Sequence, residues 1–169
     1  KDALEKMAKL PEYIRKNSRF HLIGHLQTNK AKLAVGNFDL ILSVDSVELA
    51  EVINKEAEKK QIVQNILLQI NNAREEQKSG FSPEEINPAF KEIMNLKSVK
   101  IQGVMNMAPI DADDEKLHHL FGNIKQIYDD LQSEFNVELS QISMGMSRDF
   151  KIALEEGATM IRLGRILFE

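Results

Sequence analysis

The chain has 169 residues, a length that suits one domain with a core of its own. It has no cysteine, which excludes disulfides, thiolate zinc sites, iron–sulfur clusters and cysteine nucleophiles. Lysine and arginine number 22 against 26 aspartates and glutamates, and this net charge of -4 argues against a nucleic-acid binder. No apolar run approaches the roughly 20 residues of a membrane span, so we expect a cytoplasmic protein without a membrane contact.

Short apolar runs alternate with longer amphipathic ones along the whole chain. Apolar spacing and capping residues predict helices over residues 2–16, 28–35, 46–60, 83–96, 111–135 and 147–157. Apolar runs predict strands over residues 20–23, 40–42, 66–70, 99–107, 139–143 and 160–163. No linker divides the chain, so we expect a single domain over residues 1–169.

Strict alternation of strands and helices predicts parallel strands joined by right-handed crossovers. Two α/β folds fit this order, an open doubly wound sheet and a (β/α)8 barrel. The first strand is not followed by G-x-G-x-x-G, which argues against a dinucleotide-binding sheet. Six strands are too few to close an eight-stranded barrel, and the sequence begins in a helix and stops directly after a strand.

Ligands bind at the carboxyl ends of the strands in either fold, and the sharpest feature there is the segment 143–149. Its strand ends near Ser143, Gly145 allows close backbone approach, and Ser147 is placed to open a helix. The free N–H groups and the positive end of the helix dipole would then face the strand ends, and this arrangement suits a phosphate or carboxylate. Met146 lies within the same turn. The simpler interpretation is that Ser147 only caps its helix and Gly145 only permits the turn.

The last strand carries a second candidate group, Arg162, inside an otherwise apolar run. An unpaired charge is costly there, so Arg162 either meets a polar ligand or forms a structural ion pair. Gly164 and Arg165 follow at the strand end and could extend an anion site. A phosphate would then lie between the last two strands, a position that barrels often use.

The histidines give weaker signals. His25 ends a strand and is the best candidate for the site among them. His118 and His119 are adjacent on a helix and do not share a face, so we predict no metal site.

Several segments resemble, in order, the motifs of the pyridoxal phosphate homeostasis protein family, whose members are alanine racemase N-terminal-domain-like. Residues 20–30 resemble H-x-I-G-x-L-Q-x-N-K, and residues 78–81 resemble its K-x-G segment. Residues 139–150 resemble L-S-M-G-M-S-x-D-F, and residues 157–164 match G-A-T-x-V-R-I-G. The resemblance covers nearly the whole chain.

The resemblance implies a (β/α)8 TIM barrel that binds pyridoxal 5'-phosphate at its mouth. It implies a role in buffering or delivering the cofactor, with recipient apo-enzymes as partners and without clear turnover. Carried over by motif, Arg162 would approach the pyridine nitrogen, which favours an unprotonated ring. The residues that would form or border the phosphate cup are Ser143, Gly145, Met146, Ser147, Gly164 and Arg165.

Two departures from the family pattern qualify this expectation. The family's Schiff-base lysine lies on the first barrel strand, and that strand, the second strand and one helix have no counterpart here, so no catalytic residue is assigned. We expect the parent protein to be longer and monomeric, and expect a truly truncated chain to self-associate through its open edges. Arg165 also stands where a small residue is common, so it could strengthen or crowd the cup.

Two other functions remain open. One is a racemase-like enzyme that uses the same cofactor, which would need a second acid or base on the other face of the ring. The other is a scaffold that has lost cofactor binding.

Overall fold

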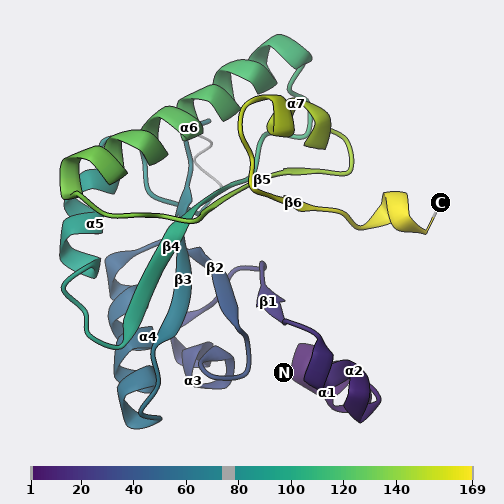
Figure 1. The fold of residues 1–169 in the computed structure, drawn as a ribbon, viewed down its shortest axis with the longest axis vertical. Coiled ribbons are helices and arrows are strands. Elements are labelled where there is room, and N and C mark those ends of the chain that lie inside the picture. Colours follow the sequence, from purple (N-terminus) through teal and green to yellow (C-terminus); the bar gives the residue numbers. More distant parts are fainter. Residues whose placement is uncertain (1, 74–78, 169) are drawn as a thin grey trace.

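A computed structural model describes residues 2–73 and 79–168 of the chain. In these residues six parallel strands form one sheet, and their order in space is their order in the chain (Figure 1). The strands are β1 (His21–Leu22), β2 (Leu40–Val44), β3 (Gln64–Ile70), β4 (Val99–Asn106), β5 (Gln141–Met146) and β6 (Met160–Arg162). The helices are α1 (Asp2–Ala8), α2 (Glu12–Asn17), α3 (Ala31–Ala34), α4 (Val47–Lys59), α5 (Ile86–Ile93), α6 (Asp114–Phe135) and α7 (Phe150–Glu155), with 3-10 turns η1 (Thr28–Lys30) and η2 (Arg165–Leu167).

The sequential strand order decides between the two expected folds. A doubly wound sheet reverses its strand order at a switch point, whereas each crossover here advances to the next position in the same direction. The expected barrel architecture, with six of its strands present, is therefore confirmed. None of the described helices is both long enough and apolar enough to span a membrane.

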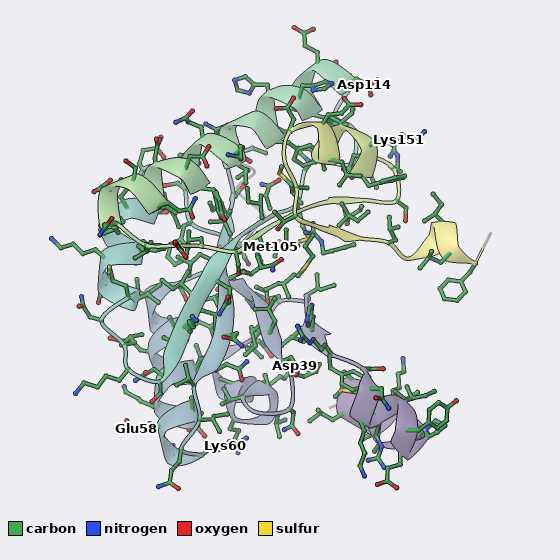
Figure 2. The ribbon with its side chains drawn as sticks, viewed as in Figure 1. Asp39, Glu58, Lys60, Met105, Asp114 and Lys151 are labelled. Carbon is green, nitrogen blue, oxygen red and sulfur yellow. The ribbon has the colours of Figure 1, made fainter. Side chains whose placement is uncertain are left out.

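The two faces of the sheet bury different sets of side chains, as a period of two along each strand requires. Ile41, Ile66 and Val104 point to the helices, which contact one another in chain order from α3 to α7. A smaller apolar cluster covers the opposite face, formed by Leu40, Leu42, Leu67 and Met105. Figure 2 shows Met105 close to the centre of the molecule. Side chains therefore fill both faces of the central strands.

Two of the differences between the predicted and observed helices have a local cause. The helix expected over residues 2–16 is two helices, because Pro11 lacks an N–H group and disfavours the helical conformation of Leu10. The helix expected from residue 83 begins at Ile86. Ser82 and Glu85 exchange hydrogen bonds ahead of it, the Glu85 N–H donating to Ser82 Oγ and the Ser82 N–H to Glu85 Oε2.

Helices α6 and α7 are joined by an ion pair on the surface. His118 Nδ1 lies 2.7 Å from Glu156 Oε1, and His118 Nε2 lies 3.6 Å from Glu155 Oε2. The hydrogen bond to Glu156 raises the pKa of His118 above its ordinary value of 6.5, with smaller contributions from the charges of Glu156, Glu155 and Asp114. The protonated imidazole therefore stabilises the contact between the two helices.

This contact predicts a pH dependence of stability. Because the pKa of His118 is raised in the folded state, its contribution is complete below the unfolded value of 6.5 and is lost as the pH rises through the folded value. The difference in urea midpoint between the wild type and His118→Gln should be larger at pH about 6 than at pH about 8.5. An equal difference at both pH values would contradict the assignment, and His119→Gln is the matched control.

Close strand pairing predicts a second effect at Gly103 in β4. A Cβ atom there would lie 1.8 Å from the carbonyl oxygen of Gln141 in β5, and φ is +151°. Gly103→Ala should lower the free energy of unfolding by about 3 kcal/mol or more. Gly24→Ala, where a Cβ meets nothing within 4 Å, should change it by less than about 1 kcal/mol. Urea denaturation measures the free energy of unfolding of both variants. Similar losses in the two would contradict the prediction and show that β4 and β5 can move apart to accept a Cβ atom.

Candidate functional site

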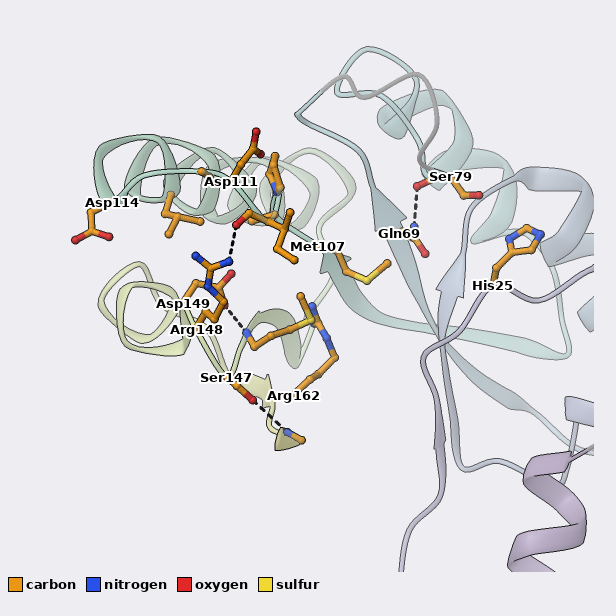
Figure 3. Close-up of a pocket in the computed structure, with 17 residues that line it drawn as sticks. His25, Gln69, Ser79, Met107, Asp111, Asp114, Ser147, Arg148, Asp149 and Arg162 are labelled. Atoms are coloured by element: carbon orange, nitrogen blue, oxygen red, sulfur yellow. Dashed lines mark hydrogen bonds between the residues drawn. The ribbon is translucent and has the colours of Figure 1, made fainter. Parts of the chain in front are cut away.

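A cavity of about 1000 Å³ opens at the carboxyl ends of the strands (Figure 3). Its walls come from the segments that follow β1, β4, β5 and β6, from Gln69 in β3, and from the first turn of α6. Gln69 is buried, and its Nε2 donates a 2.7 Å hydrogen bond to the carbonyl of Ser79, which links β3 to the segment beyond residue 78. This is the end of the sheet at which the sequence predicts a ligand.

The turn between β5 and α7 is fixed by a carboxylate. Asp149 Oδ1 accepts a 2.5 Å hydrogen bond from the Met146 N–H, and the Asp149 N–H donates to the Met146 carbonyl at 3.1 Å. Gly145 has φ +87°, and a Cβ there would lie 2.5 Å from Ala153 Cβ, so glycine allows β5 to approach α7 closely. The turn is therefore shaped by its own side chains and by tight packing below it.

The expectation that Ser147 caps the following helix is wrong. Helix α7 begins at Phe150. Asp149 occupies the N-cap position, but its side chain accepts no hydrogen bond from the first turn of the helix. Ser147 lies inside the turn, where its Oγ accepts a 3.4 Å hydrogen bond from the Gly164 N–H beyond β6. Strand β5 also extends to Met146, so Ser143 is in mid-strand. The hydroxyl of Ser147 is thus positioned beside the cavity and is not used as a helix cap.

Arg162 places a cation in the cavity wall. Its Nη1 donates to Ser143 Oγ and its Nη2 to the Asn106 carbonyl, both at 2.7 Å. Both acceptors are neutral, so the alternative of a structural ion pair is not supported among the described residues. Burial lowers the pKa of Arg162 to about 10, partly offset by the charge of Asp149. The side chain therefore remains charged at neutral pH.

One nitrogen of Arg162 has no hydrogen-bond partner among the described residues. Its Nε is buried and forms no hydrogen bond with any part of the chain that the structure describes. A buried N–H of this kind is costly unless a ligand supplies an acceptor. Arg162 also lines the cavity, so the arrangement fits a ligand that presents a lone pair to Nε.

The wall after β1 carries His25. Its Nδ1 lies 3.1 Å from Asp45 Oδ2, and Asp45 follows β2. The turn before it is held by Ser43 Oγ, which donates a 2.7 Å hydrogen bond to the Gly24 carbonyl. His25 is one of the residues lining the cavity, as its position at a strand end predicts.

The structure brings four of the seven predicted cofactor-binding residues together at the cavity, namely Met146, Ser147, Arg162 and Gly164. Ser143 is fully buried and contacts Arg162. Gly145 lies under the turn, next to α7. The side chain of Arg165 and the whole of Lys78 are outside the described residues.

Asn106 and Asp149 also shape the site, and their roles were not predicted from the sequence. Asn106 holds Arg162 through its main-chain carbonyl, and no sequence signal marks a carbonyl acceptor. Asp149 shapes the turn, and its position three residues after Met146 is a spacing at which a carboxylate can accept from a main-chain N–H. No group of three or more metal-ligating side chains occurs in residues 2–73 or 79–168.

Comparison with known proteins gives one consistent family. The model of the alanine racemase N-terminal domain matches residues 5–169. A pyridoxal phosphate homeostasis protein of Aquifex aeolicus is 43% identical over 149 residues, which are 88% of this chain and 65% of that protein. A protein of the same name from Synechocystis is 37% identical over 167 residues, 99% of this chain and 76% of its own length. The chain thus spans about two thirds to three quarters of these curated relatives.

Solved structures agree with the sequence relatives. PipY of Synechococcus elongatus, determined without PLP, superposes with a TM-score of 0.92 at 34% identity, over 99% of this chain and 78% of PipY. PipY determined with PLP bound gives 0.86 at 32% identity, over 99% and 76%. Alanine racemase of Clostridium difficile shares the fold, with a TM-score of 0.76 at 18% identity over 92% of this chain and 41% of the racemase.

The carboxylate of Asp149 gives a testable prediction for the turn. Asp149→Ala removes the acceptor and leaves the Met146 N–H unpaired, so the free energy of unfolding should fall by about 1 to 3 kcal/mol. Asp149→Asn keeps an oxygen at the same place and should lose less than about 1 kcal/mol. Urea denaturation and amide exchange at Met146 measure the effect. Equal losses in the two variants would show that the hydrogen bond does not hold the turn.

Proposed function

Because the chain belongs to the alanine racemase N-terminal domain family, and within it to the pyridoxal phosphate homeostasis proteins, we propose that its cavity binds pyridoxal 5'-phosphate. The observation that carries this proposal is the buried Nε of Arg162, which has no hydrogen-bond partner among the described residues and belongs to a side chain in the cavity wall. The relatives' name and the PLP-bound structure of PipY support the choice of ligand.

Arg162 would serve the pyridine ring. The ring nitrogen of pyridoxal phosphate carries a lone pair in its unprotonated form, which is the acceptor that Nε lacks. A guanidinium at this nitrogen disfavours ring protonation and so weakens the electron-sink chemistry that the cofactor supplies when bound. The contact therefore suits retention of the cofactor better than carbanion chemistry.

Ser147, Met146 and Gly164 would serve the phosphate. Ser147 and Gly164 are in hydrogen-bond contact across the ends of β5 and β6 and line the cavity with Met146. A phosphate accepts hydrogen bonds from hydroxyl groups, and the Ser147 hydroxyl, which accepts a hydrogen bond from the Gly164 N–H, keeps its own proton for such a bond at this corner of the cavity. We assign Ser143 and Gly145 to support of this corner, and Arg165 to its border. All these contacts are non-covalent, so the proposal does not depend on a Schiff-base lysine.

We assign the protein a role in cofactor buffering or delivery inside the cytoplasm, without enzymatic turnover and with recipient apo-enzymes as its partners. The name of the relatives supports this role over a racemase. A racemisation assay with free amino acids and added pyridoxal phosphate distinguishes the two. Turnover above that of free cofactor, abolished in Arg162→Met, would favour the enzyme.

Direct binding tests the ligand assignment. Fluorescence titration with pyridoxal phosphate should give saturable binding to the wild type. Arg162→Met should raise Kd roughly 10- to 100-fold, because it removes the charged donor and keeps an unbranched side chain. Ser147→Ala should raise Kd about fivefold through the loss of a neutral hydrogen bond. Arg15→Met, an exposed arginine on α2, is the control and should leave Kd unchanged. Equal affinity in the wild type and Arg162→Met would refute the proposed site.

A further inference from the structure

The position of Arg162 depends on a strand to which its own strand is not paired. Strand β6 pairs with β5, yet the guanidinium of Arg162 reaches past Ser143 of β5 to the carbonyl of Asn106, the last residue of β4. Both contacts are made by the Nη atoms, so together they determine the direction of the remaining donor, Nε. A displacement of the end of β4 would therefore change the direction of Nε.

The end of β4 is itself held by the carboxamide of Asn106. Asn106 Nδ2 donates to the carbonyl of Ile70 in β3 at 3.0 Å and to Asn72 Oδ1 at 2.9 Å. Asn72 Nδ2 in turn donates to the carbonyl of Leu120 at 2.8 Å and to Asn123 Oδ1 at 3.2 Å, both on α6. We name Asn106, Asn72 and Asn123 the amide chain, and it connects Arg162 to α6.

The carboxamide of Asn106 is present despite an unfavourable environment. The residue is 1% exposed, and its Oδ1 has no hydrogen-bond partner among the described residues. A buried amide oxygen without a partner is destabilising, and an apolar side chain of similar size would avoid that cost. The part of the side chain that makes useful contacts is therefore its donor group, Nδ2, which joins β4 to β3 and to the amide chain.

We propose that Asn106 is a positioning residue for Arg162. Its carboxamide fixes the location of its own main-chain carbonyl, and this carbonyl directs the guanidinium of Arg162 at the cavity wall. The inference rests on the proposed function for its consequence in ligand binding, since Nε is the group assigned to the pyridine nitrogen. Its structural part, the coupling of Asn106 to Arg162, holds with or without a ligand.

Nuclear magnetic resonance of the ligand-free protein tests the coupling directly. The Nε–H signal of Arg162, assigned by its loss in Arg162→Lys, should exchange slowly with water because Nε is buried. Asn106→Ala should shift this signal and speed its exchange about tenfold or more. Asn106→Thr keeps a donor for the Ile70 carbonyl and should restore part of the protection. Asn95→Ala, which removes an exposed side-chain bond at the end of α5, is the matched control.

Ligand discrimination tests the consequence. The probes are pyridoxal phosphate and its deaza analogue, which lacks the ring nitrogen. Asn106→Ala should reduce the preference for pyridoxal phosphate over the analogue about tenfold. Competition by inorganic phosphate should stay within about twofold of the wild type, since Ser147 and Gly164 are untouched. In an Arg162→Met background, Asn106→Ala should have no further effect on the preference.

The outcomes separate the inference from the proposed function. An unchanged Arg162 Nε–H signal in folded Asn106→Ala overturns the inference, whether or not the wild type binds pyridoxal phosphate. A changed signal in a wild type that fails to bind the cofactor supports the coupling and refutes the proposed function. If Asn106→Ala does not fold, Asn72→Ser, which shortens the amide chain one step further from Arg162, is measured in its place. The same shift and faster exchange are then expected, and their absence overturns the proposal.

Discussion

The arrangement of the cavity depends on the burial of one charge, the guanidinium of Arg162. Burial lowers its pKa to about 10, so the group is still protonated at neutral pH and must find acceptors inside the protein. The acceptors are the hydroxyl of Ser143 and the carbonyl of Asn106, which belong to two different strands. Because both are neutral, they accept hydrogen bonds from the two Nη atoms without cancelling the charge of Arg162, and the positive potential remains available to a ligand.

The need of the buried guanidinium for acceptors explains why hydrogen bonds connect the ends of β4, β5 and β6. Arg162 spans all three strands, while Ser147 joins the segment after β5 to Gly164 after β6. Asp149 then holds the turn from below through the Met146 N–H. Side chains with different chemistry, a cation and a hydroxyl, are thus presented to the same cavity from a rigid edge of the sheet. A ligand with an acidic group and a separate lone pair suits such an edge.

The sequence predicts the parts of this structure that arise from periodicity and local chemistry. Apolar runs predict all six strands, and the helix predicted from residue 46 begins at Val47, with Ser46 as its cap and its Oγ accepting from the Leu49 N–H. The function of Ser147 was harder to predict, since a serine after a strand is as suitable for a turn as for a cap. The partners of Arg162 were not predictable from periodicity, because a main-chain carbonyl accepts hydrogen bonds whatever its side chain. Long-range contacts of this kind appear only when the strands are placed side by side.

Helix α6 supports both halves of the cavity wall from behind. Near its start, His118 pairs with Glu156 at the end of α7, the helix that follows the turn of Ser147. Leu120 and Asn123, within two turns of His118, receive the amide chain that leads through Asn106 to Arg162. The site assigned to the phosphate and the site assigned to the pyridine ring are therefore supported by one stretch of one helix. A movement of that stretch of α6 would displace both sites at once. The distance between the two sites therefore depends on α6 as well as on the strands.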